Sequence, residues 1–205
     1  MLEYEKIYKR LFMINIIEDF KISELKDTKF IHPVKVTFSQ NGKAKTWEAV
    51  RSHDSVAILL YHKEKEAFLL VKQFRAPVYL NDKTKTFTYE LCAGLIDKNK
   101  SIEEIVIEEI DEECGYKVHI DNILKISSFY TNVGISGGRQ HLYFASIDES
   151  MKIHNGGGVN DEQIELHFLP LSECDNFLFD EEKAKTPGLM FSFYWFLKNR
   201  QELGL

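Results

Sequence analysis

Short runs of hydrophobic residues, separated by polar and turn-forming segments, recur along most of the chain. Such runs are typical of buried β-strands. The strands predicted in this way cover residues 34–40, 44–50, 55–61, 67–74, 87–92, 123–130, 141–147 and 164–169. Asn41 and Gly42 join the first two runs. Because both central residues of a type I′ turn need a positive φ, this dipeptide predicts a β-hairpin.

Two further segments have the pattern of helices. Ser101 can cap a helix, with Glu104 three residues later completing a capping box, and Gly115 stands where that helix should end. A closing apolar helix is expected over 189–200. Because strands outnumber helices and one helix lies among them, the sequence predicts a mixed α/β or α+β sandwich.

The mid-chain helix carries an unusual face. Residues spaced as on one side of a helix begin with Ile102 and two more aliphatic side chains, and then reach Glu109, Glu112 and Glu113. Carboxylates directed toward a core need compensation, and a cluster of oxygen ligands suits Mg²⁺, Mn²⁺ or Ca²⁺. Periodicity alone also allows a solvated, glutamate-rich helix with no metal.

Composition narrows the class of protein. With 205 residues, 44% of them hydrophobic, and a formal net charge of −6, the chain has room for one globular domain and an extension. It has no basic surplus for a nucleic-acid partner. The three cysteines lack metal-ligand spacing, and neither a signal-peptide core nor an apolar run of membrane-spanning length is present. We therefore expect a soluble cytoplasmic protein without a membrane partner.

The segment from Gly94 to Tyr116 resembles the Nudix box, G-x5-E-x7-R-E-U-x-E-E-x-G-U, where U is a bulky apolar residue. The E-U-x-E-E-x-G core matches in register from Glu109 to Gly115. Two positions depart from the pattern, because Lys100 replaces the early Glu and Glu108 replaces the Arg that usually orients the helix carboxylates.

Motifs outside the box resemble the branch of the family that includes UDP-glucose and ADP-ribose pyrophosphatases. VKQFRAPVY at 71–79 and YELCAGLID at 89–97 carry that likeness, and SGGRQ at 136–140 and GGGV at 156–159 favour UDP-sugar members. The resemblance implies a Nudix fold, in which a mixed sheet is sandwiched between helices. It also implies a homodimer, with residues 1–52 as an extension carrying the dimerising hairpin and 53–205 as the hydrolase domain.

The resemblance further implies a metal site. Glu109 and Glu113 are the leading ligands for Mg²⁺, with Mn²⁺ as a substitute, and the carbonyl of Ala93 adds a ligand. Glu112 is either a third ligand or the residue that positions a water. The general base comes from the loop before the last strand, where Glu162 is the first candidate and Asp161 the second. If Asn160 occupies the family's base position, the base lies in the helix cluster instead.

Substrate contacts are implied at four positions. Arg75 matches an arginine directed at substrate phosphate, which its forked guanidinium suits. Glu90 either binds substrate or braces the box. Trp47 either stacks on the nucleobase from the partner subunit or packs in the dimer interface. Arg51 is a candidate contact for the terminal sugar or phosphate.

The function implied is Mg²⁺-dependent hydrolysis of the diphosphate bond of a nucleoside-diphosphate sugar, giving a nucleoside monophosphate and a sugar phosphate. The alternative is a Nudix-fold module that binds nucleotide sugars without cleaving them, and Glu108 in place of Arg is its only support in the sequence. Neither the base nor the sugar follows from the residues.

Overall fold

The computed structural model describes residues 17–28, 31–159 and 162–205. The strands are β1 (His32–Gln40), β2 (Lys43–Arg51), β3 (Ser55–His62), β4 (Ala67–Gln73), β5 (Thr88–Glu90), β6 (Cys92–Leu95), β7 (Ile123–Tyr130), β8 (Arg139–Ile147), β9 (Glu165–Pro170) and β10 (Ala184–Lys185). The helices are α2 (Ala76–Asn81), α3 (Ile102–Glu109), α4 (Cys174–Phe179) and α5 (Pro187–Asn199), together with shorter helical turns.

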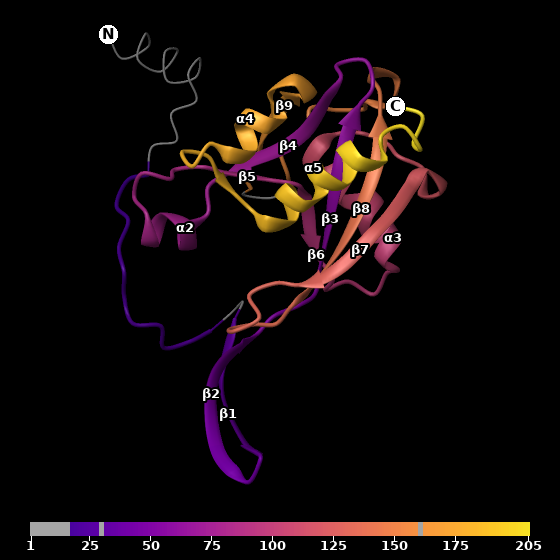
Figure 1. The fold of residues 1–205 in the computed structure, drawn as a ribbon. Coiled ribbons are helices and arrows are strands. Elements are labelled where there is room, and N and C mark those ends of the chain that lie inside the picture. Colours follow the sequence, from indigo (N-terminus) through magenta and orange to yellow (C-terminus); the bar gives the residue numbers. More distant parts are fainter. Residues whose placement is uncertain (1–16, 29–30, 160–161) are drawn as a thin grey trace, which may run out of the picture.

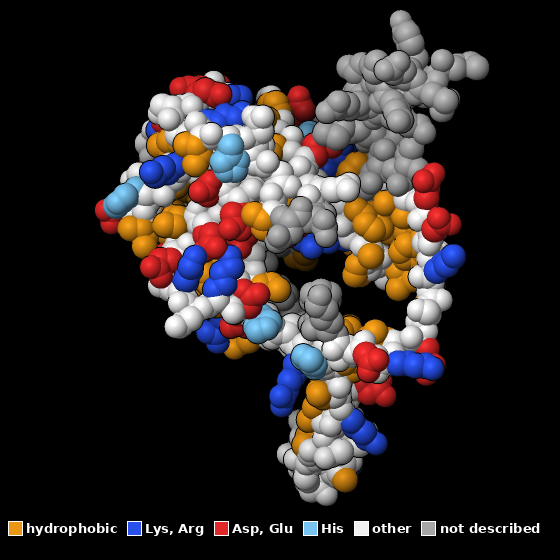
Figure 2. All heavy atoms as spheres, turned by 180° about the vertical axis from the view of Figure 1, so that it is seen from behind, with side chains coloured by type: hydrophobic (Ala, Val, Ile, Leu, Met, Phe, Trp, Pro, Cys, Tyr) orange, Lys and Arg blue, Asp and Glu red, His pale blue; other side chains and the backbone are white. Residues whose placement is uncertain are grey.

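Strands β1 and β2 form a separate hairpin that projects away from the body of the protein (Figure 1). Asn41 and Gly42 have φ values of 52° and 73°, so the predicted turn is confirmed. Val36 lies directly opposite Trp47 in the pairing register, which gives one face of the hairpin an apolar character. Figure 2 shows hydrophobic side chains along this projecting hairpin.

The remaining strands form one mixed sheet in the order β10-β5-β4-β3-β8-β7, with β6 also paired to β3 and β9 to β4. Strand β3 changes its neighbour along its length, because residues 55–58 pair with β6 and residues 60–62 pair with β4. This change separates the ends of β4 and β6. Residues near that separation line a cavity.

Helices cover both faces of the sheet (Figure 1). The even-numbered residues of β3 pack with α3, whereas the odd-numbered ones pack with α4 and α5. A strand buried on both faces has no polar alternation, which explains the continuous apolar run at 55–61. The predicted α+β fold with a mixed sheet between helices is therefore confirmed.

The structure corrects the expected elements in two places. The strand expected over 87–92 is divided at Leu91 into β5 and β6, which pair with different strands. Helices α2 and α4 lie in segments for which we predicted no helix. Both are only six residues long, too short to establish a helical period. Among the described residues, no helix is both long and apolar enough to cross a membrane.

Candidate active site

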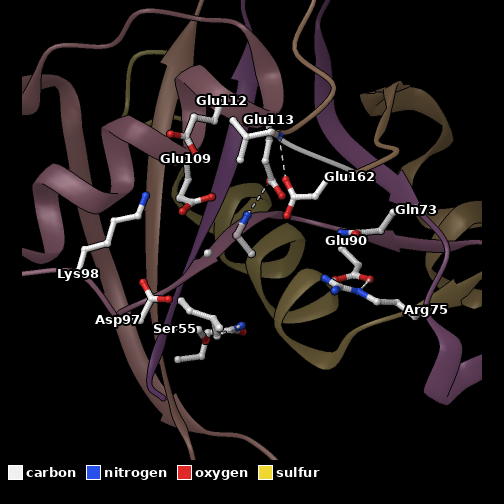
Figure 3. A pocket seen from close by; sticks show the side chains of 15 residues that line it. Ser55, Gln73, Arg75, Glu90, Asp97, Lys98, Glu109, Glu112, Glu113 and Glu162 are labelled. Atoms are coloured by element: carbon white, nitrogen blue, oxygen red, sulfur yellow. Dashed lines mark hydrogen bonds and ion pairs between the residues drawn. The ribbon is translucent and has the colours of Figure 1, made fainter. Parts of the chain in front are cut away.

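A cavity of about 530 Å³ opens where β3, β4, β5 and β6 meet the C-terminal half of the α3 segment (Figure 3). Its lining is strongly acidic. The side chains around it are Ser55, Gln73, Arg75, Glu90, Ala93, Gly94, Leu95, Asp97, Lys98, Glu109, Glu112, Glu113, Gln140, Val159 and Glu162. The three helix glutamates predicted from the sequence thus face one cavity, together with Arg75 and Glu90.

The local sequence sets the direction of the helix that carries these glutamates. Ser101 and Glu104 form the predicted capping box at its start. After Glu109 the helix continues as a π-helical turn, Ile110–Cys114, and Gly115 ends it with a φ of 76°. Wider π turns often occur at functional sites because they change the direction of side chains. Here the turn carries Glu112 and Glu113.

Glu113 is the most deeply buried of the helix carboxylates, with 5% of its surface exposed. Its Oε2 accepts a hydrogen bond from the backbone N–H of Ala93 at 2.9 Å. Burial is the main cause that raises the pKa of Glu113 to about 8, although the Ala93 bond opposes that shift. Such a carboxyl needs a cation beside it to remain ionised near neutral pH.

Glu109 occupies space that only a glycine leaves free. A Cβ atom on Gly94 would lie 2.1 Å from the Glu109 carboxyl carbon. Burial, followed by the charge of Glu112, raises the pKa of Glu109 to about 7. The first glycine of the box therefore allows this carboxylate to lie against β6.

The triple-glycine loop is attached to the same helix. The N–H groups of Gly157 and Gly158 donate to the carbonyls of Glu113 and Glu112, at 2.9 and 3.1 Å. A Cβ atom on Gly156 would lie 2.2 Å from the Glu113 carbonyl oxygen, so the close approach requires glycine there. The loop thereby brings Glu162 to the cavity.

Glu162 lines the cavity, and its Oε2 accepts a hydrogen bond from the Val159 N–H at 3.0 Å. The other two candidates for the base position, Asp161 and Asn160, lie outside the described residues. The choice of general base therefore stays a prediction.

Arg75 and Glu90 form a forked ion pair. The Arg75 Nε and Nη2 donate to the two Glu90 carboxylate oxygens, each at 2.8 Å. This pairing is the main cause that raises the pKa of Arg75, and the charges of Glu113 and Glu162 act in the same direction. Arg75 is therefore a fixed positive charge on the wall opposite the helix glutamates.

Trp47 and Arg51 do not line this cavity within one chain. The Trp47 Nε1 donates to the carbonyl of Gly134 at 2.9 Å, and 57% of the residue's surface is exposed. Arg51 ends β2 and is exposed. Within one chain the structure does not bring either residue to this cavity, and their contact with substrate stays a prediction.

Sequence reasoning missed five polar residues of the cavity: Ser55, Gln73, Asp97, Lys98 and Gln140. They lie at strand ends and in the β6–α3 loop, and no spacing rule connects them. The pairing of β3 with β4, β6 and β8, a long-range property of the sheet, brings these strand ends together.

The donor set at this cavity fits a divalent metal. Glu109, Glu112, Glu113 and the Ala93 carbonyl offer only oxygen atoms, which hard cations prefer. The basic side chains of the lining, Arg75 and Lys98, are already paired to Glu90 and Glu108. The charge of Lys98 partly offsets the burial of Glu109, but in the described part of the chain neither Glu109 nor Glu113 is paired with a cation of the protein.

A second acidic cluster is less suitable for a metal. In the described part of the chain, ligand atoms of His62, Glu64 and Glu149 lie within 4.8 Å of one another, closer than any three in the cavity. The Lys65 ammonium lies 2.8 Å from Glu149 and 3.3 Å from His62. The cluster therefore already holds a positive charge, and the cavity is the better candidate for a metal site.

The raised pKa values predict how stability depends on pH. Without metal, the folded state retains protons on Glu109 and Glu113 that the unfolded state has released above its pKa of 4.5. The free energy of unfolding should therefore fall as pH rises to about 8. His62, His141 and His167, whose pKa values are lowered by burial, give the opposite slope, which ends near 6.5.

Thermal unfolding between about pH 7 and pH 8 isolates the carboxyl effect. We expect the metal-free protein to lose stability across this window, and Mg²⁺ to restore it progressively at the higher pH. A metal-free protein whose stability stays level or rises in this window would contradict the assignment of both carboxyls.

Comparison with known proteins places this geometry in a family. The NUDIX domain model matches residues 51–188. A uridine diphosphate glucose pyrophosphatase, NUDT14, from Bos taurus is 31% identical over 88% of this chain and 94% of its own length. Its Mus musculus counterpart is 28% identical over 82% of this chain and 88% of its own length.

A third relative is bacterial. GDP-mannose pyrophosphatase from Pectobacterium atrosepticum is 42% identical over 59% of this chain and 61% of its own length. The domain match covers the sheet, the glycine-rich loop and the helix with the clustered glutamates. The resemblance predicted from the sequence is thus confirmed, and the chain belongs to the Nudix family.

Proposed function

We propose that this protein hydrolyses the diphosphate bond of a nucleoside-diphosphate sugar in the presence of Mg²⁺, with Mn²⁺ as a substitute, to give a nucleoside monophosphate and a sugar phosphate. The observation that carries the proposal is the half-buried Glu109 and the buried Glu113, which share one cavity with the fixed charge of Arg75. A volume of about 530 Å³ lies within the range for small-molecule sites. The names of the relatives point to the same substrate class.

The residues have separate tasks in this proposal. Glu109, Glu113 and the Ala93 carbonyl hold the metal, and Glu112 either completes the ligand set or positions a water. Bound divalent metal neutralises diphosphate oxygens and lowers the pKa of a coordinated water. Arg75 binds the phosphate that faces the opposite wall, and Glu90 fixes the direction of its guanidinium.

The attacking water must lose a proton to a base. Glu162 is our first choice because it lines the cavity, and Asp161 is the second.

The binding-only alternative has less support. A site that only bound the substrate would have no need for a buried and a half-buried carboxyl that both have a raised pKa.

A substrate panel tests the function. UDP-glucose, GDP-mannose, ADP-ribose, ADP-glucose and a diadenosine polyphosphate are each incubated with Mg²⁺, and kcat/KM is compared. We expect at least one of the nucleotide sugars to be hydrolysed and to exceed the diadenosine compound by on the order of tenfold or more. If nucleotide sugars bind to the protein but none of them is hydrolysed, the binding-only alternative replaces this proposal.

We propose a homodimer joined through the hairpin. Val36, Phe38 and Trp47 share one face of β1 and β2, and they are 42%, 41% and 57% exposed. A two-stranded hairpin is marginal alone, and a second copy of the chain related by two-fold symmetry would cover this apolar face. The same contact would bring Trp47 and Arg51 to the partner's cavity.

The three free cysteines agree with a location in a reducing cytoplasm.

Trp47→Ala tests this arrangement. We expect KM to rise about tenfold while kcat changes by less than about twofold, because stacking on a base holds substrate and transition state equally. Thr37→Ala, on the opposite face of the hairpin, is the matched control. A strictly monomeric wild type in sedimentation at micromolar concentration, with an unchanged KM in Trp47→Ala, would refute the dimer and the stacking role.

A further inference from the structure

The two departures from the Nudix pattern lie in contact with each other. The pattern expects Glu at position 100 and Arg at position 108, and this chain has Lys100 and Glu108. The Lys100 ammonium donates to the Glu108 Oε2. Each position therefore carries the charge that the pattern expects at the other, and in this chain the two side chains of opposite charge are in contact.

A second lysine supports the same carboxylate. The Lys98 ammonium donates to the Glu108 Oε1 at 2.5 Å, so both oxygens of Glu108 are bound by cations. These bonds are the main causes that lower the pKa of Glu108. The β6–α3 loop, which carries both lysines, is thereby held against the second turn of α3.

The contact lies next to the proposed metal ligands. Glu108 precedes Glu109 and lies one helical turn before Glu112. Lys98 lines the same cavity as those two glutamates, and Figure 3 shows its side chain reaching toward their helix. Without the lysines, Glu108 would add a like charge at i,i+4 from Glu112.

We propose that Lys98, Lys100 and Glu108 form a positioning clamp with reversed charges, which takes the place of the Glu and Arg of the Nudix box and directs Glu109 and Glu112 toward the metal. The inference rests on the proposed function only in assigning the metal to this cavity. It also removes the sequence support for the binding-only alternative, because Glu108 has a partner of the opposite sign.

A charge-exchange cycle tests the clamp. Lys100→Glu and Glu108→Arg are made singly and together. Mn²⁺ affinity is measured by electron paramagnetic resonance of the free ion, and kcat is measured with the best nucleotide sugar. We expect each single variant to bind Mn²⁺ about tenfold more weakly, as is usual when a residue that orients a metal ligand is lost. The double variant should recover to within about threefold of the wild type.

The controls separate a positioning role from a general effect of charge or stability. Lys198→Glu makes the same charge change at an exposed position of α5, and it should leave Mn²⁺ affinity unchanged. The melting temperature should change little in all variants, because exposed ion pairs contribute little to stability. A double variant no better than the worse single variant, or single variants with wild-type affinity, would overturn the clamp. Loss and recovery of Mn²⁺ affinity in a protein without sugar hydrolysis would support the clamp and refute the function.

Discussion

Glu113→Gln should lower kcat by on the order of a hundredfold or more while leaving the fold intact. The amide keeps the volume of a side chain that is 5% exposed, and its oxygen can still accept the Ala93 N–H. What is lost is the negative charge that we propose holds a divalent ion. The measurement is steady-state turnover of a nucleotide sugar over a wide range of Mg²⁺ concentrations.

Two further readouts make this result specific. The metal-free variant should be at least as stable as the wild type at about pH 8. In the wild type, burial disfavours the ionised form of Glu113 and raises its pKa, which lowers the stability of the folded state at this pH, and glutamine removes that cost. Glu202→Gln, an exposed glutamate near the C-terminus, is the control for the same chemical change. Wild-type turnover at low Mg²⁺ in Glu113→Gln would remove this residue from the ligand set.

Gly94→Ala should reduce activity by on the order of a hundredfold, without a comparable loss of stability. The new methyl would lie 2.1 Å from the Glu109 carboxyl, which must therefore move away from the position in which we propose that it binds the metal. The displaced group is the end of a flexible side chain, so the backbone of β6 need not change. Turnover and melting temperature are measured on the same preparation.

Gly156→Ala provides the contrast. Its methyl would lie 2.2 Å from a backbone oxygen of Glu113, and Gly156 has a φ of 63° that alanine rarely adopts. This variant should therefore lose stability as well as activity. If Gly94→Ala destabilises the protein as much as Gly156→Ala does, the space beside Glu109 serves the fold and not the metal site.

Much of the fold could be predicted from residues that lie close together in the sequence. Asn41-Gly42 determined the hairpin turn, and Ser101 with Glu104 determined where the acidic helix begins. The helical period also identified Glu109, Glu112 and Glu113 as one face, and the structure brings all three to one cavity. These features depend on residues close together in sequence, for which spacing rules are strong.

The remaining features depend on contacts that are distant in sequence. Gln73 and Gln140 reach the cavity only because β3 pairs with β4 and β8 along the sheet. The partners of Glu108 could not be read from a helical wheel, because Lys98 and Lys100 lie in the preceding loop. For that reason Glu108, considered from the sequence alone, supported the alternative of a module that binds nucleotide sugars without cleaving them.

The identity of the reaction products tests the central claim most directly. With Mg²⁺ and the best nucleotide sugar, ³¹P nuclear magnetic resonance should show one nucleoside monophosphate and one sugar phosphate formed in equal amounts. Removal of the metal with a chelator should stop the reaction, and added Mg²⁺ or Mn²⁺ should restart it. Release of inorganic pyrophosphate, or turnover that persists after the metal is removed, would contradict the proposed function.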